Sequence, residues 1–189
     1  MIMGCGAASD GDPSASSTTG VSNGDSAALS SSEAESLASD NSAGQDITLE
    51  VVDIEGYQQA LERHKGKVVF VDFWATWCTP CMENFPHTVH IHRAFPQDQV
   101  AVISVSLDDP ESKDAALAFL QQQEARFDNL LSQYGAGVES FEKFGIDEAI
   151  PHYKIYDRQG QLVKSLTPGP DLKITLELLE AEVRAVLEQ

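Results

Sequence analysis

Runs of apolar residues alternate with amphipathic segments along the chain from position 47 onward. Two runs, Val68–Phe73 and Gln99–Leu107, are apolar at nearly every position and rich in β-branched residues. Unbroken runs of this kind predict strands that helices cover on both faces. Shorter runs at 47–52, 152–156 and 161–166 predict three further strands, and Asp157-Arg158-Gln159-Gly160 predicts the hairpin turn between the last two.

The segments between these runs have helical spacing. Helices are predicted at 57–63, after the run ending at Phe73, at 115–120, at 138–144 and at 172–187. Residues 125–145 are predicted to be a looser insertion, interrupted at Gly135-Ala136-Gly137. The order of elements predicts an α/β fold, with a central mixed β-sheet, helices on both faces and a βα insertion.

Composition divides the chain into two parts. Residues 7–46 are mostly Ser, Ala, Gly and acidic residues, with no aromatic residue, Lys or Arg. Such a segment buries too little apolar surface to offset the entropy of ordering, so residues 1–46 are predicted to be a disordered tether and 47–189 the folded domain. The net charge of −18 argues against nucleic acid and against unaided adsorption on anionic lipid, and favours soluble protein partners.

Two cysteines lie where the first buried run gives way to a helix. In Trp77-Cys78-Thr79-Pro80-Cys81, Pro80 suits a first helical turn. The helix dipole and free amide groups there lower a cysteine pKa, so Cys78 is predicted to be the attacking thiolate and Cys81 the resolving thiol. Half of a zinc site and a structural disulfide are the alternatives, but the remaining cysteine, Cys5, lies in the tail, and so short a loop constrains little of the unfolded chain.

The stretch from Val71 to Cys81, followed by Pro86, resembles the active-site strand and helix of thioredoxin-fold proteins. The insertion at 125–145 is similar to the one that distinguishes the TlpA/ResA type from minimal thioredoxin. The resemblance implies a thioredoxin-like fold, a thiol:disulfide oxidoreductase activity and a buried acid at Asp72. Asp72 is predicted to accept or relay the proton of Cys81, because burial raises a carboxyl pKa; a strand-end group bonded to local backbone is the alternative.

The dipeptide Ile150-Pro151 directly precedes a predicted strand. The resemblance implies a cis-proline that faces the cysteines and keeps the dithiol from capturing metal, with Ile150 pairing to substrate main chain. A trans X-Pro bond at an edge strand is the alternative. Thr79 and Pro80 are also predicted to bind substrate, and Trp77 to shield the sulfurs, whereas Trp74 is predicted to pack in the core.

Cofactor and metal sites are not predicted. His87, His90 and His92 invite a metal hypothesis, but on a helix His92 points away from the other two. Met1-Ile2-Met3-Gly4-Cys5 resembles the end of a bacterial lipoprotein signal, which would place a lipid on Cys5, although the charged and hydrophobic regions that precede such a cysteine are missing. A chance cysteine in the tail is the alternative.

The predicted function is an extracytoplasmic thiol:disulfide oxidoreductase. It would be a reductase for disulfides of exported proteins, as in cytochrome c maturation, supplied by an upstream thiol electron donor. A thiol oxidase of the same fold and a non-catalytic copper-binding module are the alternatives. A peroxidase is disfavoured because no Pro-x-x-x-Thr-x-x-Cys motif precedes the pair. The predicted location is the periplasm or cell envelope, where the protein would be attached to the membrane only through Cys5. A cytoplasmic location is the alternative.

Overall fold

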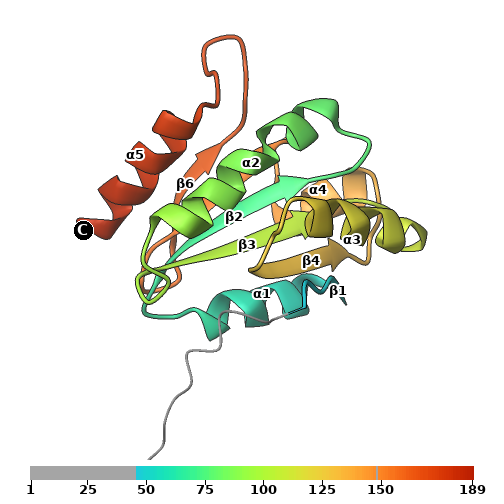
Figure 1. Ribbon diagram of the computed structural model, residues 1–189, viewed down its shortest axis with the longest axis horizontal. Coiled ribbons are helices and arrows are strands. Elements are labelled where there is room, and N and C mark those ends of the chain that lie inside the picture. Colours follow the sequence, from blue (N-terminus) through green and yellow to red (C-terminus); the bar gives the residue numbers. More distant parts are fainter. Residues whose placement is uncertain (1–45, 148) are drawn as a thin grey trace, which may run out of the picture. The chain divides into compact units, whose positions relative to one another are not determined.

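The structure is a computed structural model that describes residues 46–147 and 149–189. Residues 1–45 of the predicted tether, which include Cys5, lie outside these residues. A six-stranded sheet has the order β1-β4-β3-β2-β5-β6 (Figure 1). The strands are β1 (Glu50–Val52), β2 (Val68–Trp74), β3 (Val100–Ser106), β4 (Asp128–Ser132), β5 (His152–Tyr156) and β6 (Leu162–Leu166). The helices are α1 (Ile54–Arg63), α2 (Thr79–Ala94), η1 (Pro110–Ser112), α3 (Lys113–Gln122), α4 (Val138–Phe144) and α5 (Leu176–Leu187).

Strands β2 and β3 are buried at every position, which confirms their prediction as central strands. The first four strands in sheet order pair in parallel, while β5 runs antiparallel to β2 and β6 antiparallel to β5. The sheet is therefore mixed. Because successive side chains in a strand point to opposite faces, β2 contributes to two separate cores.

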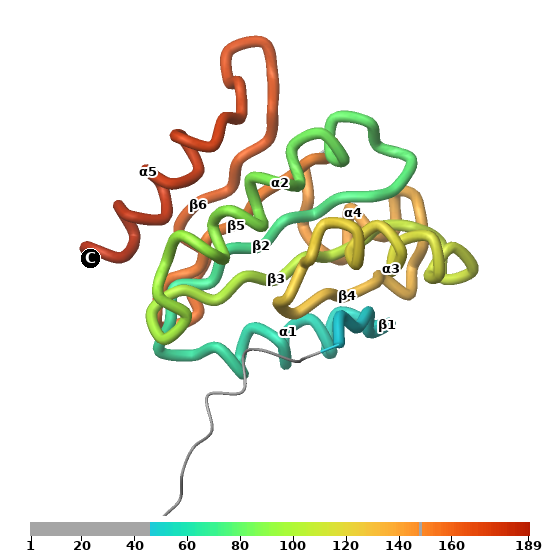
Figure 2. The backbone as a smooth tube through the Cα atoms, viewed as in Figure 1, coloured from blue at the N-terminus to red at the C-terminus, as the bar shows by residue number. Residues whose placement is uncertain are grey.

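Helices cover both faces of the sheet, as predicted (Figure 2). On one face, α1 and α4 pack against the odd-numbered positions of β2, from Val69 to Phe73. On the other face, α2, α3 and α5 pack against the even-numbered positions, which include Phe70 and Trp74. The cysteines and Asp72 belong to this second face.

Strand β4 is the main difference from the prediction. The sequence suggested a looser segment at 125–145, but residues 128–132 form a buried strand between β1 and β3. The sequence pattern did not predict this strand because it begins with two polar residues, Asp128 and Asn129. The Asn129 side-chain amide can be buried because it donates hydrogen bonds to the carbonyls of Ala125 (2.9 Å) and Phe127 (2.8 Å). Hydrophobic periodicity does not reveal this local arrangement.

The last helix begins at Leu176 rather than at the predicted Leu172. Residues 168–174 form a loop in which Gly169 and Leu172 make an isolated antiparallel bridge. The helix begins after Thr175, whose hydroxyl accepts the amide hydrogen of Leu178 at 3.3 Å. Leu172 has the spacing of the helix's apolar residues because the loop, with Leu172 and Ile174, packs in the same core as α5.

A buried lysine ties β5 to the end of α4. The Lys154 ammonium donates to the carbonyls of Phe144 (2.6 Å) and Gly145 (2.7 Å), which are among the last in the helix. Gly145 has φ +58°, a left-handed conformation that ends the helix. Burial lowers the pKa of Lys154, and the nearby Asp147 opposes this shift. Lys154 therefore holds the chain that leads from α4 to Ile150.

Replacement of this lysine is expected to weaken the domain. Lys154→Met leaves the carbonyls of Phe144 and Gly145 without their donor, which costs about 2 kcal/mol of unfolding free energy in urea titrations. The matched control is Lys164→Met, which removes a partly exposed ion pair with Glu182 (2.9 Å). That change is expected to stay within about 0.5 kcal/mol. Equal effects of the two variants would contradict this assignment to Lys154.

Candidate active site

The two cysteines lie at the beginning of α2. Cys78 is the N-cap residue, and its Sγ accepts the amide hydrogen of Cys81 at 3.3 Å. The two sulfurs form a disulfide, with the Cα atoms 5.3 Å apart. Cys78 is 6% exposed and Cys81 only 1%. The outer sulfur therefore has an amide donor at a helix N-terminus, the arrangement that stabilises a thiolate.

The turn that delivers Cys78 is held by Asp108, which follows β3. Its carboxylate accepts the Thr76 amide (3.0 and 3.1 Å to its two oxygens), the Thr76 hydroxyl (2.6 Å) and the Ser106 hydroxyl (2.7 Å). Asp108 is 1% exposed. The sequence pattern does not predict this role for Asp108. Its position at the carboxyl end of a parallel strand beside β2 was the signal, because such ends meet at one edge of the sheet.

The segment before β5 meets the outer cysteine. The Ile150–Pro151 peptide bond is cis, which confirms the predicted geometry. The Ile150 carbonyl oxygen lies 3.7 Å from Cys78 Sγ. A cavity of about 410 Å³ begins at this junction. Its walls come from the first turns of α2, the cis-proline segment and the 168–174 loop, and include Pro80, Asn84, Ile150, Pro151, Leu172 and Ile174.

Asp72 lies on β2 beneath α2 and is 1% exposed. The Thr88 hydroxyl donates to its Oδ2 at 2.6 Å. Burial raises the pKa of Asp72 to about 7, although the Thr88 hydrogen bond opposes the shift. The predicted direction of this pKa shift is thereby confirmed. Thr88 lies two helical turns beyond Cys81 on the buried side of α2, so Asp72 contacts this helix from inside the protein.

The remaining predicted residues surround the outer sulfur. Trp77 is 54% exposed beside Cys78, and Thr79 and Pro80 are exposed in the first turn of α2. Trp74 is fully buried and packs against Phe85 and Phe119, with ring centroids 5.0 Å away in each case. Its prediction as a core residue is confirmed.

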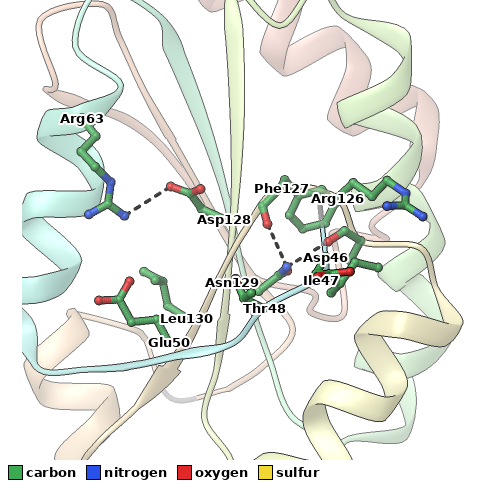
Figure 3. Close-up of a pocket in the computed structure, with 11 residues that line it drawn as sticks. Asp46, Ile47, Thr48, Glu50, Arg63, Arg126, Phe127, Asp128, Asn129 and Leu130 are labelled. Carbon is green, nitrogen blue, oxygen red and sulfur yellow. Dashed lines mark hydrogen bonds and ion pairs between the residues drawn. The ribbon is translucent and has the colours of Figure 1, made fainter. Parts of the chain in front are cut away.

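Two other features lie away from this centre. His90 contacts Glu180 (2.8 Å), whereas His92 contacts Gln97 (3.3 Å), so these two histidines point to different neighbours. A cavity of about 150 Å³ lies beside β4 (Figure 3), where Arg63 pairs with Asp128 at 3.4 Å. None of the predicted active-site residues lines this cavity.

Known proteins are similar to this chain in sequence and in fold. The thiol-disulfide oxidoreductase ResA of Bacillus thuringiensis is 29% identical over 127 residues, 67% of this chain and 69% of that protein. ResA of Halalkalibacterium halodurans is 27% identical over 136 residues, 72% of this chain and 74% of that protein. The solved structure of a thiol:disulfide interchange protein DsbE from Chlorobium tepidum has a TM-score of 0.56 and 28% identity over 67% of this chain and 84% of that one.

A thioredoxin-like superfamily protein of known structure has a TM-score of 0.58 at 24% identity, covering 68% of this chain and 85% of that one. Fold and cysteine site together define a thiol:disulfide oxidoreductase with a thioredoxin-like fold, similar to these ResA proteins. The family model described as AhpC/TSA matches residues 41–165, and the chain belongs to this family.

The Asp108 contacts predict a destabilising substitution. Asp108→Ala leaves the Thr76 amide and two hydroxyls without an acceptor, which is expected to lower the unfolding free energy by about 3 kcal/mol. The exposed Asp98 provides the control, since Asp98→Ala should change it by less than about 0.5 kcal/mol. Urea unfolding of both variants tests this, and an Asp108→Ala protein as stable as the control would show that Asp108 does not hold the turn.

The raised pKa of Asp72 predicts how stability depends on pH. A carboxyl whose pKa is higher in the folded than in the unfolded state stabilises the protein at low pH, and this contribution is lost as pH rises through about 7. The loss amounts to about 4 kcal/mol. Asp72→Asn should therefore be more stable than the wild type at pH 8 and similar near pH 4, as measured by urea unfolding of the oxidised forms. A constant difference across this range would contradict the assignment.

Proposed function

We propose that this protein is an extracytoplasmic reductase that transfers electrons from its Cys78–Cys81 dithiol to disulfides of exported proteins. The observation that carries the proposal is the contact between Cys78 Sγ and the Ile150 carbonyl, 3.7 Å apart at the mouth of the adjoining cavity. A substrate bound there would place its reacting sulfur at Cys78 and its main chain at the neighbouring Ile150.

The reaction proceeds by two exchanges. The Cys78 thiolate attacks one sulfur of the substrate disulfide; a Cys78–substrate bond forms, the substrate S–S bond breaks, and the released thiolate takes a proton from solvent. Cys81 then loses its proton and attacks Cys78 Sγ, which forms the enzyme disulfide and releases the second substrate thiolate. Two electrons pass to the substrate, and an upstream thiol donor reduces the enzyme again.

Asp72 is proposed to accept the proton of Cys81. Its pKa of about 7 lets it gain and lose a proton near neutral pH, where a general base is most effective. Asp72 meets α2 at Thr88 rather than at the first turn, so we assign the transfer to a bridging water. Asp72 is therefore protonated when the enzyme is in its disulfide form.

Substrate binding is assigned to the surface around Cys78. Ile150 would pair with the main chain of an extended segment, a mode in which backbone hydrogen bonds give affinity and side-chain pockets give specificity. Trp77, Thr79 and Pro80 would flank the reacting sulfur, and Pro151 would occupy the position from which a metal could otherwise reach both thiolates.

The surroundings of the cysteines favour reduction over oxidation. A strongly oxidising dithiol requires a stabilised thiolate in its reduced form. Within the described residues, no Lys, Arg or His hydrogen-bonds to either sulfur. The reduced form therefore has only the helix N-terminus to stabilise it, and it gives up its electrons readily.

The proposed location is the periplasm or cell envelope. The low-complexity composition of residues 7–46 suits a tether of considerable reach, and a lipid on Cys5 would attach it to the membrane. Among the helices that the structure describes, none is long and apolar enough to cross a bilayer. Apocytochrome c and other exported cysteine proteins are the proposed substrates.

Serine variants of the two cysteines test the mechanism. Cys78→Ser is expected to abolish insulin-disulfide reduction, whereas Cys81→Ser should accumulate a mixed disulfide with the substrate that is visible on non-reducing gels. The dithiol of the wild type should titrate at a reduction potential near that of thioredoxin, about −270 mV. Full activity of Cys78→Ser would refute the nucleophile, and a potential near −120 mV would refute the direction.

A further inference from the structure

Two buried polar atoms without a partner lie on facing strands next to the active site. Among the described residues, four buried side-chain polar atoms lack a hydrogen-bond partner, and Asp72 Oδ1 and Tyr153 Oη are two of them. Asp72 and Tyr153 are directly paired in the antiparallel ladder between β2 and β5. Directly paired residues have their side chains on the same face, with Cβ atoms about 5 Å apart.

The Tyr153 side chain is held in position and stays protonated. It is 0% exposed and stacks on Phe70, with the ring centroids 5.7 Å apart. Burial raises the pKa of Tyr153, and the negative charge of Asp72 raises it further. A neutral phenol opposite a carboxylate can only act as the donor.

We propose that Tyr153 is the second hydrogen-bond donor to the Asp72 carboxylate and positions it for proton exchange with Cys81. Thr88 already donates to Oδ2, so Oδ1 is the oxygen that needs a donor. The bond forms when Asp72 ionises, either directly or through one water, because a buried carboxylate with one donor leaves its other oxygen desolvated.

The other neighbours of Asp72 leave this role to Tyr153. Ser104, its partner on β3, donates its hydroxyl to Asn129 at 2.8 Å. Trp74 has an unpartnered indole N–H on the same face, but it lies two positions along β2 rather than directly opposite. Burial and the Thr88 hydrogen bond determine the pKa of Asp72, and no charged side chain of the described residues contributes to its shift.

This inference rests on the proposed role of Asp72 as proton acceptor and adds which residue adjusts the pKa of its carboxyl group. Protonated Asp72 in the oxidised enzyme needs little from the phenol. When Cys81 is to be deprotonated, the Tyr153 hydrogen bond stabilises the ionised carboxylate and keeps it available as a base near neutral pH. Tyr153 is thus a positioning residue that acts through Asp72.

The test follows the ionisation of Asp72 itself. In protein labelled with ¹³C at aspartate side chains, Tyr153→Phe is expected to raise the Asp72 titration midpoint by about one pH unit, a tenfold change in its protonation equilibrium. The matched control is Tyr156→Phe, a buried tyrosine on the same strand that packs in the opposite core and bonds to Tyr57 (2.9 Å). This control should leave the midpoint unchanged.

A second measurement uses the unmodified tyrosine, so the test does not depend on how the Phe variant folds. The ¹³Cζ resonance of Tyr153 should shift with the Asp72 midpoint in wild-type protein, and this shift should disappear in Asp72→Asn. An unmoved midpoint in Tyr153→Phe, or a midpoint that moves only in Trp74→Phe, would overturn the inference.

The two proposals fail in different ways. The role of Asp72 as proton acceptor would be disproved if Asp72→Asn resolved mixed disulfides at the wild-type rate across pH 6–9. The titrations of Asp72 and Tyr153 do not depend on that rate. A coupled titration with normal Asp72→Asn kinetics would therefore keep the hydrogen bond and remove only its catalytic use.

Discussion

The burial of β2 on both faces is the constraint on which the site depends. Every residue of this strand is buried, so beyond Val68 the chain next reaches solvent after the strand ends at Trp74. The turn that follows is fixed by Asp108, and it places Cys78 at the N-terminus of α2. The reactive sulfur is consequently near the surface while its resolving partner, one turn further on, stays inside. Strand, turn and helix together produce the unequal environments that a two-step exchange needs.

Much of this arrangement was predictable because its causes are local. Apolar runs identify the central strands, and the spacing of Cys78 and Cys81 after such a run indicates the redox site. The helix at 138–144 and the strand at 152–156 were predicted at their observed boundaries. The cis bond before Pro151 was inferred from a family resemblance, since local physical chemistry alone favours a trans bond.

The features that sequence reasoning missed depend on contacts between distant segments. Asp108 resembles any acidic residue after a strand until β3 is placed beside β2, where it meets Thr76. Lys154 appeared to be an ordinary strand residue, although its ammonium is buried against the end of α4. Tyr153 gains its significance only from the register that sets it opposite Asp72. Burial of Asp108 and of Lys154 is explained by partners that the linear pattern does not show.

The position of β4 between β1 and β3 also affects the order in which the domain can fold. Glu50 in β1 pairs with Leu130 in β4, so the first strand in the sequence has no place in the sheet until β4 is present. Pairings across such long separations form late, because the entropy of closing the loop must be overcome first. During synthesis, the N-terminal edge of the sheet can therefore close only after β4 has been made.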